Sequence, residues 1–306
     1  MKWSATENIA WRADLPGPGS SSPITVGNRV FITCYSGYGV ADPIGDQKDL
    51  KRHLLCFNRA TGDLLWKKQF DPKLPEHAYQ GEGAYHGYAA STPVSDGERL
   101  YVFFGKSGVL CFTLDGEQLW QSFVGEGTHG WGSGTSPVLY KNSLIINASV
   151  ESGSLIAFDK LSGQELWKAK EIRSSWNTPL LVEGKDRTEL VVNVEGRVLS
   201  FAPADGAPLW NADGVHRYVC PSVVSHGDMI YAIGGGHTSL AVRMGGKDDV
   251  TATHEIWKKT KGSNVGSPSS AARMRRRARL SIRSDWNRVR ERSGRHPFWR
   301  MESCIS

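Results

Sequence analysis

Short apolar segments of four to seven residues alternate along the chain with turns that contain glycine. Residues 91–124 show the pattern most clearly, because Leu100–Phe104 and Val109–Leu114 are rich in aromatic and β-branched residues, which favour strands. The dipeptides Asp96-Gly97 and Asp115-Gly116 bound these segments and are typical of tight turns. With an initial strand at Pro93 and a final strand at Trp120, the unit predicts a four-stranded antiparallel meander.

The meander repeats along the chain. Two markers recur in fixed order, a proline step and a tryptophan, and the later intervals of the proline step are 44, 42, 42 and 47 residues. The proline steps are Ser22-Pro23, Thr92-Pro93, Ser136-Pro137, Thr178-Pro179, Cys220-Pro221 and Ser267-Pro268. The tryptophans are Trp66, Trp120, Trp167, Trp210 and Trp257. A helical solenoid is the rival for this period, but the segments are too short and too rich in glycine for helices.

A lone four-stranded sheet leaves one face bare, whereas sheets stacked radially bury both faces and form a β-propeller. The sequence therefore predicts an all-β propeller with five complete four-stranded antiparallel blades and fragments of another. The predicted blades are 20–70, 91–124, 135–172, 177–213 and 219–259, and the first carries an insertion, Tyr35–Arg52, whose three aspartates we expect in solvent. Asn8–Trp11 resembles a fourth strand of a terminal blade.

The turn before the tryptophan carries a family resemblance. Cys56–Trp66, Ala157–Trp167 and Ser200–Trp210 resemble the A-x-D-x-x-T-G-x-x-x-W repeat of PQQ-like, quinoprotein-type β-propellers. In such a repeat glycine takes the turn and tryptophan docks between adjacent blades, so Trp11 and the five later tryptophans are expected to be structural. The resemblance covers residues 8–268, and the fifth repeat departs from it at Gly245–Lys247.

The resemblance implies three kinds of function. The family includes non-enzymatic outer-membrane assembly lipoproteins, quinoprotein alcohol dehydrogenases and sensor domains of bacterial Ser/Thr kinases. We expect a non-catalytic binding or scaffold module for a protein or a small-molecule ligand. The alternatives are a PQQ-dependent alcohol or sugar dehydrogenase, or a fragment of one, and a sensor propeller. The resemblance also implies a periplasmic or secreted protein.

Polar and aromatic residues gather just before each proline step, where the chain would enter the innermost strand at one mouth of the channel. Aromatic rings, histidines and an arginine converging there could stack on a planar acidic ligand such as a quinone. The simpler expectation is that most of them pack between blades. The candidates are His86, Tyr88, His129, Trp131, Trp176, Asn177, Arg217 and Tyr218.

The sequence offers little for redox or metal chemistry. No clustered acidic segment suggests the calcium cage that a bound PQQ would need, and Asp42, Asp46 and Asp49 lack the spacing of a calcium loop. We therefore expect no metal and no cofactor, with PQQ and calcium as the alternative. The GxGxxG at Gly125–Gly130 lacks a following helix, and a similar segment, Gly81–Tyr88, precedes it, so both are predicted to be loops between blades.

Charge distinguishes the C-terminal segment from the rest of the chain. Residues 269–306 hold 11 Arg, no Lys and three acidic residues, which more than accounts for the net charge of +6. Because the repeat pattern stops at Pro268, the sequence predicts an incomplete propeller over 1–268 and a basic, disordered or out-of-frame tail, with a ring that cannot close. We expect no specific nucleic-acid binding and no membrane span, and residues 1–11 lack a signal-peptide core.

Cys56 and Cys111 fall inside apolar strands and are expected to be buried.

Overall fold

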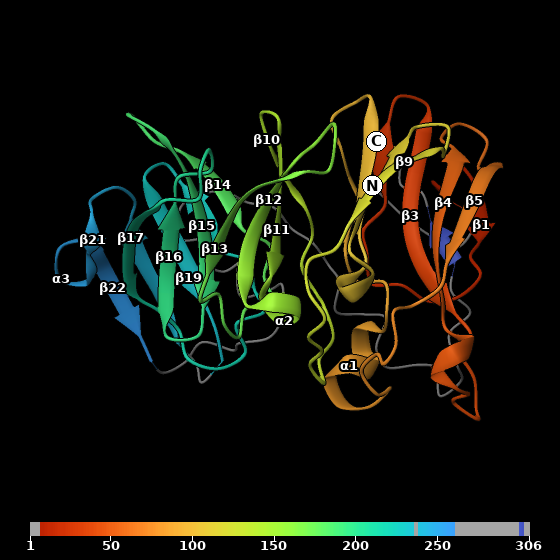
Figure 1. Cartoon of the computed structure of the whole chain (residues 1–306), viewed down its shortest axis with the longest axis horizontal. Helices are drawn as coiled ribbons and strands as arrows, with labels where there is room; N and C mark the ends of the chain where they lie inside the picture. Colours follow the sequence, from red (N-terminus) through yellow and green to blue (C-terminus); the bar gives the residue numbers. More distant parts are fainter. Residues whose placement is uncertain (1–6, 236–237, 261–299, 303–306) are drawn as a thin grey trace.

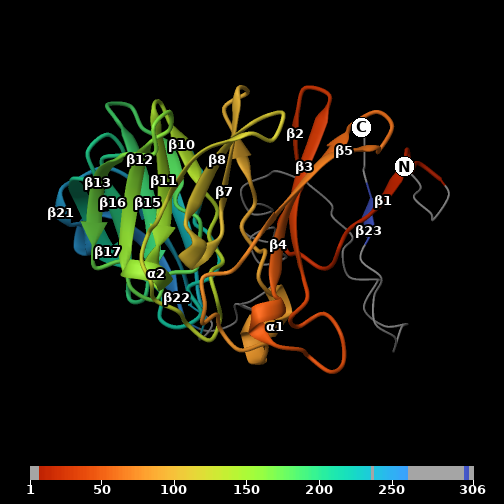
Figure 2. The same ribbon diagram turned by 45° about the vertical axis from the view of Figure 1, so that its right-hand side comes forward.

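Five antiparallel sheets stand side by side in chain order in the computed structural model, which describes residues 7–235, 238–260 and 300–302 (Figure 1). Each sheet contains an antiparallel meander of four strands, to which the fourth sheet adds a short fifth strand, and the two views agree on the order of the sheets (Figure 2). The first sheet consists of β2 (Ile24–Val26), β3 (Arg29–Ser36), β4 (Lys51–Asn58) and β5 (Leu64–Phe70), and the second of β6 (Val94–Ser95), β7 (Arg99–Phe103), β8 (Val109–Thr113) and β9 (Gln118–Ser122). The third consists of β10 (Val138–Tyr140), β11 (Ser143–Ala148), β12 (Ser154–Asp159) and β13 (Glu165–Lys170). The meander of the fourth consists of β14 (Leu180–Glu183), β15 (Thr188–Val194), β16 (Arg197–Phe201) and β17 (Pro208–Asp213), and the fifth sheet of β18 (Val224–His226), β19 (Met229–Ile233), β20 (Ser239–Arg243) and β22 (Glu255–Lys259). The predicted propeller blades are confirmed.

Apolar residues fill the spaces between successive sheets. One buried cluster joins Phe31 of β3 to Leu100 of β7, and the next joins Tyr101 of β7 to Leu144 of β11. Two further clusters lie between the third and fourth sheets and between the fourth and fifth. The hydrophobic core is therefore divided into layers, each shared by two blades, as radial stacking requires.

The predicted burial of two cysteines is confirmed. Cys56 of β4 and Cys111 of β8 have no exposed surface. Burial raises the pKa of Cys56 to about 11 and that of Cys111 to about 12, so both thiols stay protonated at neutral pH. Both side chains act as small apolar groups in the layers between blades.

Hydrogen bonds link the first strands of successive blades to one another. The backbone N–H that opens each blade donates to a Ser or Thr hydroxyl of the next blade at 2.9–3.0 Å. The donor and acceptor pairs are Ser22 with Thr92, Thr92 with Ser136, Ser136 with Thr178, and Thr178 with Ser222. The first strands are thus the inner edges of the blades. In the fifth blade Ser222, and not the predicted Cys220, holds the repeat position, because the hydroxyl makes the link and the proline is only its usual neighbour.

The repeat tryptophans form a second set of contacts, here called the seam, at the fourth strands. A Cβ placed on the turn glycine of one blade would lie within 3 Å of the tryptophan of the preceding blade. The tryptophan and glycine pairs are Trp11 with Gly62, Trp66 with Gly116, Trp120 with Gly163, and Trp167 with Gly206. Each of these indole N–H groups donates to a backbone carbonyl in the same turn at 2.8–3.3 Å. The turn glycines all have positive φ, so glycine serves both the backbone and the close approach of the ring.

The contact between the fourth and fifth blades departs from this scheme. Trp210 is buried and donates to the Glu189 carboxylate of its own blade at 2.6 Å. The insertion that breaks the fifth repeat forms β21 (Asp248–Asp249), which pairs in parallel with β17, and the short helix α3 (Thr251–His254). Val250 lies in the same buried cluster as Trp210. The segment that departs from the repeat therefore covers Trp210 in place of a glycine turn.

At the N-terminus, Trp11 occupies the seam position ahead of the first blade, as a fourth-strand tryptophan would. The strand itself, β1 (Arg12–Asp14), begins directly after the predicted segment Asn8–Trp11 ends, and it pairs antiparallel with β23 (Arg300–Glu302). A strand in the tail was not expected. The rest of the tail and the predicted boundary at residue 268 lie outside the described residues.

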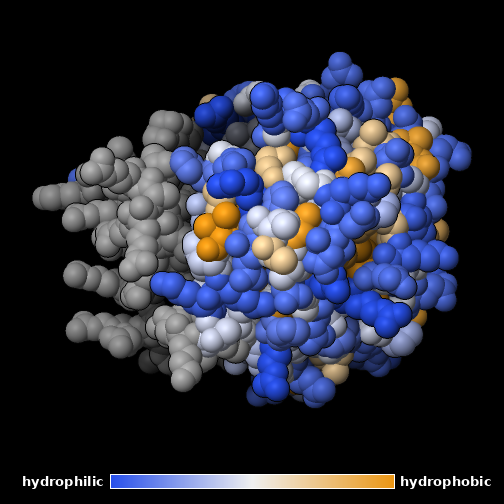
Figure 3. All heavy atoms as spheres, turned by 90° about the vertical axis from the view of Figure 1, so that its left-hand side faces the viewer, coloured by the Kyte–Doolittle hydropathy of each residue, from blue (hydrophilic) through white to orange (hydrophobic). Residues whose placement is uncertain are grey.

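The surface at the opposite end of the row of blades is largely hydrophilic. Figure 3 views the side that carries β17, β21 and β22, and small apolar spots there are separated by hydrophilic side chains. Ile256 of β22 is one exposed apolar residue of this region, and it lies beside Glu255 and Trp257. The face shown therefore carries scattered apolar side chains rather than one continuous apolar surface.

Candidate functional site

The segment that leads into the first strand of each blade, here called the lead-in loop, contributes to one cavity of about 280 Å³. Blades one to five all supply lining residues, so the cavity lies at one mouth of the central channel, where the hydroxyl links bring the inner strands together. The lining residues are Ser20, Glu82, His86, Ala90, Trp131, Gly134, Trp176, Tyr218 and Cys220.

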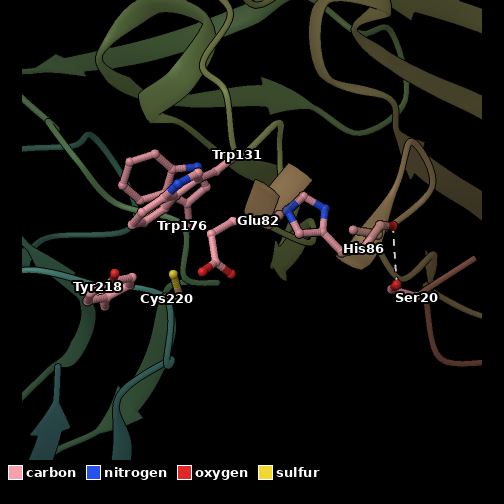
Figure 4. Close-up of a pocket in the computed structure, with 9 residues that line it drawn as sticks. Ser20, Glu82, His86, Trp131, Trp176, Tyr218 and Cys220 are labelled. Atoms are coloured by element: carbon pink, nitrogen blue, oxygen red, sulfur yellow. Dashed lines mark hydrogen bonds between the residues drawn. The ribbon is translucent and has the colours of Figure 1, made fainter. Parts of the chain in front are cut away.

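Three aromatic side chains form one wall of this cavity, and we call them the mouth cluster: Trp131, Trp176 and Tyr218 (Figure 4). The rings of Trp131 and Tyr218 are stacked, with centroids 5.2 Å apart and planes inclined by 12°. Trp176 lies 4.7 Å from Trp131 and donates its indole N–H to the Gly132 carbonyl at 3.0 Å. His129 contacts the cluster edge-on, 4.8 Å from Trp176. Lead-in loops of three blades thus bring their aromatic rings together.

The backbone holds Tyr218 in an unusual conformation. Arg217 and Tyr218 are consecutive non-glycine residues with positive φ, 63° and 48°. Each such residue costs about 1–2 kcal/mol, and residues of this kind are concentrated at functional sites. The result is that Tyr218 stacks on Trp131 while 51% of its surface stays exposed.

The opposite side of the cavity is polar and comes from the second blade. The helix α1 (Gly81–His86) carries Glu82 in its first turn and His86 in its last. Figure 4 shows the Glu82 carboxylate pointing toward Cys220 and the aromatic wall, with His86 on the far side. Burial lowers the pKa of His86 below its ordinary value, so the ring is neutral at pH 7. Although Cys220 as a residue is exposed, desolvation of its thiol, followed by the charge of Glu82, raises the pKa of Cys220 to about 11.

A buried glutamate supports the third lead-in loop from below. Glu151, in α2 (Ser149–Ser152), is 4% exposed and accepts a hydrogen bond from Ser133, next to Gly134 of the cavity. Its backbone carbonyl accepts the Gly127 N–H at 2.9 Å. Burial raises the pKa of Glu151 to about 7, against the opposing effect of the Ser133 hydroxyl.

The structure divides the eight predicted site residues. His86, Trp131, Trp176 and Tyr218 line the cavity, and His129 touches its aromatic wall. The side chain of Arg217 is exposed and is not part of the lining, while its carbonyl accepts the Gly235 N–H at 2.6 Å.

The remaining two candidates are buried beneath the mouth. Tyr88 is 5% exposed and donates its hydroxyl to the His77 carbonyl at 2.8 Å. Asn177 is 1% exposed, and its amide donates to the carbonyls of Asn193 and Val219 at 2.6 and 3.1 Å. Both side chains hold the lead-in loops in place rather than face the cavity.

Sequence reasoning missed Glu82, Cys220 and Ser20. Glu82 was overlooked because Gly81–Tyr88 was interpreted as a loop, whereas Gly81–His86 forms α1 and directs Glu82 to the cavity. For the other predicted loop the structure agrees, since no helix follows Gly125–Gly130 before β10. The predicted solvent exposure of Asp42, Asp46 and Asp49 in the first-blade insertion is confirmed.

Comparison with known proteins defines the class as that of PQQ-like β-propellers. A family profile described as "Outer membrane protein assembly factor BamB" matches residues 1–211 and 50–274, so the chain belongs to this family. In a sequence comparison, no curated protein matches the chain.

Solved structures show the same fold at low sequence identity. BamB from Moraxella catarrhalis has a TM-score of 0.56 and 14% identity, over 82% of this chain and 66% of that chain. Quinohemoprotein alcohol dehydrogenase from Comamonas testosteroni has a TM-score of 0.56 and 12% identity, over 85% of this chain and 46% of that chain. Quinohemoprotein alcohol dehydrogenase ADHIIG from Pseudomonas putida HK5 has a TM-score of 0.53 and 10% identity, over 82% and 43%. The chain therefore spans about two thirds of the BamB chain and less than half of either dehydrogenase.

The cavity lining does not suit a bound pyrroloquinoline quinone. That cofactor carries several carboxylates and needs cationic partners, but the lining holds one carboxylate, a neutral histidine and neither lysine nor arginine. Within the described ranges, no three His, Cys, Asp or Glu side chains come together to hold a metal ion. The aromatic wall alone resembles a surface on which a quinone could stack.

The helices of the described residues are also short. The longest is α1 with six residues, and none in this part of the chain is long and apolar enough to cross a membrane.

Proposed function

We propose that the chain is a non-catalytic binding propeller that holds its ligand or partner at the channel mouth through the mouth cluster. The observation that carries the proposal is the stacking of Tyr218 on Trp131 beside Trp176, on three lead-in loops, around a cavity open to solvent. Aromatic side chains that stay half exposed at a hollow are typical of recognition surfaces, since they offer large contact area at low entropic cost.

Several features support binding over catalysis. The lining combines aromatic faces with one carboxylate and one neutral histidine, which can recognise a ligand but supply no set of groups for hydride or electron transfer. The dehydrogenase alternative rests on fold similarity alone, and a fold does not determine function. The sensor alternative has no observation of its own in its favour.

A role outside the cytoplasm accompanies this proposal. The family description names an outer membrane protein assembly factor, and the related structure from Moraxella catarrhalis is BamB itself. We propose that this chain likewise works in the extracytoplasmic space, as a scaffold that contacts another protein. Fractionation of the native host, with the chain detected by antibody, should place it in the periplasmic or envelope fraction.

The test of binding uses variants of the mouth cluster. Ligand-observed NMR against a set of small aromatic, cationic and anionic probes should detect binding by the wild type, which is lost in Trp131→Ala and in Tyr218→Ala. Phe123→Ala is the matched control, because Phe123 is an aromatic residue that is 60% exposed and is not among the residues that line the cavity. The proposal fails if no probe binds, or if the control loses binding equally.

Catalysis is tested on the same protein. Dye-linked oxidation of alcohols and sugars is measured after addition of the quinone and calcium. We expect no turnover above the rate without protein, and turnover that Trp176→Ala abolishes would establish the dehydrogenase instead.

A further inference from the structure

The cavity at the channel mouth carries a carboxylate that no described residue neutralises. Glu82 is exposed and makes no hydrogen bond or ion pair with the described residues. Two further ionisable groups of the lining, His86 and Cys220, are both neutral at pH 7, because burial lowers the pKa of the first and desolvation raises that of the second. An anionic ligand would therefore meet repulsion from Glu82, with no cation among the described lining residues to compensate.

The one charged group of the described lining is a hydrogen-bond acceptor. The Glu82 carboxylate accepts hydrogen bonds only. Nδ1 of His86 has no hydrogen-bond partner among the described residues, but it is buried from solvent. A complementary ligand thus carries N–H donors as well as positive charge.

The aromatic wall favours a cation for an independent reason. The faces of Trp and Tyr rings attract cations, most strongly where water is partly excluded. Tyr218 is covered by Trp131 on one side and lies close to Gly235, and 51% of its surface is exposed and can be reached by a ligand. Guanidinium groups stack on such faces and still donate their N–H groups in the ring plane.

The volume of the cavity limits the size of the ligand. The cavity, at about 280 Å³, lies just below the range of about 300–1,000 Å³ typical of small-molecule sites. It accommodates a single side chain or a small amine more readily than a multi-ring cofactor.

Resting on the proposed binding function, we propose that the mouth cluster and Glu82 form a site for an alkylguanidinium or alkylammonium cation, the group that an arginine or lysine side chain carries. The cation lies against the exposed part of Tyr218, which Trp131 supports from its other side, and donates to the carboxylate of Glu82. The same chemistry occurs in a free amine and in an exposed side chain of a partner protein.

The experiment compares two isosteric probes on the full chain. N-acetyl-arginine amide and N-acetyl-citrulline amide have nearly the same shape, but only the first is charged. Isothermal titration calorimetry should show the arginine probe binding at least about tenfold more tightly. Glu82→Gln should remove that preference by weakening the arginine probe about tenfold, with the citrulline probe unchanged.

The control variant is Glu126→Gln, which removes an exposed carboxylate from the neighbouring lead-in loop, where Glu126 pairs with Lys73 at 2.8 Å. It should leave both affinities unchanged. Trp131→Ala should weaken both probes, because it removes the aromatic surface that they share.

The outcomes separate the two proposals. If both probes bind equally and Glu82→Gln has no effect, the cation site is wrong while binding at the mouth stands. If neither probe nor any other ligand binds, the proposed function fails as well.

A further arm identifies the source of the cation. An extended Gly/Ser peptide with one central arginine is compared with butylguanidine. Tighter binding of the peptide points to a partner protein, and equal or weaker binding of the peptide points to a free amine. Failure of both to bind would overturn the proposal.

Discussion

The seam and the mouth cluster use the same kind of side chain in opposite ways. At the seam, one tryptophan per blade lies on a glycine turn of the next blade and satisfies its N–H on a backbone carbonyl, and the arrangement repeats from Trp11 to Trp167. At the mouth, the aromatic residues come from three of the five lead-in loops only, and Tyr218 remains half exposed on a strained backbone. The comparison indicates that tryptophans repeated in successive blades hold the blades together, whereas the partly exposed aromatic residues of three lead-in loops are available for the proposed recognition.

The largest expected effect comes from removing a seam tryptophan. Trp167→Ala should lower the free energy of unfolding by about 3–5 kcal/mol, because the ring is 9% exposed and fills the space over Gly206. Urea unfolding followed by circular dichroism measures the change. Leu166→Ala, at an exposed position beside it, is the control and should change stability by less than about 0.5 kcal/mol. Equal effects of the two substitutions on the free energy of unfolding would contradict a structural role for the seam tryptophans.

A glycine pair separates ring contact from backbone strain. Gly206 and Gly227 both have positive φ, but only a Cβ on Gly206 would meet a neighbour, Trp167, at 2.5 Å. Gly227→Ala should cost about 1 kcal/mol for the backbone alone, and Gly206→Ala should cost roughly 2–4 kcal/mol because the ring must also move. Chemical denaturation of both variants tests this, and the seam contact is refuted if the two costs are the same.

The stability that Glu151 contributes beneath the mouth should depend on pH, whereas the stability contributed by the seam tryptophans should not. The pKa of Glu151 is raised in the folded state from an ordinary 4.5 to about 7, so its contribution to stability is present below pH 4.5 and is lost as the pH rises toward 7. Glu151→Gln should remove this dependence, worth on the order of 3 kcal/mol across that window. Thermal unfolding between pH 4.5 and 8 measures it.

The control for this titration is the substitution Glu126→Gln. Glu126 is an exposed carboxylate on the lead-in loop that Glu151 supports, and its hydrogen bond and charge interaction with Lys73 lower its pKa. It should retain the wild-type pH profile above pH 5. A Glu151→Gln profile that matches the wild type would show that the buried carboxyl does not titrate in this range.

The smallest effect on stability is expected at the mouth itself. Tyr218→Ala should change the free energy of unfolding by less than about 1 kcal/mol, because the ring is half exposed and its backbone is strained. Calorimetric unfolding of this variant beside Trp167→Ala compares the two regions directly. A loss at Tyr218 as large as that at Trp167 would assign both to the framework.

The sequence predicts the seam and much less of the mouth, for a physical reason. Glycine, tryptophan and turn dipeptides recur because each blade must solve the same packing problem, so their period is visible in one chain. In the fifth blade the proline step Cys220-Pro221 marks the repeat, but Ser222, two residues after Cys220, makes the hydroxyl link.

The lead-in loops obey no such constraint. Tyr88 and Asn177 were predicted as site residues because they lie close to a proline step. Loops lack the alternation of a strand that distinguishes inward-facing from outward-facing side chains, so their burial could not be predicted. Glu82 reaches the cavity because Gly81–His86 is helical, and no turn or period in the sequence signals that.

Indole signals give the most direct test, because one spectrum reports on both classes of tryptophan. In a ¹⁵N-labelled sample of the full chain, the Nε1–H resonances of the 11 tryptophans are assigned by substitution and followed during titration with N-acetyl-arginine amide. The account predicts that the signals of Trp131 and Trp176 shift together in a saturable way, while those of Trp66, Trp120 and Trp167 stay in place. Shifts at the seam tryptophans with none at the mouth would contradict it.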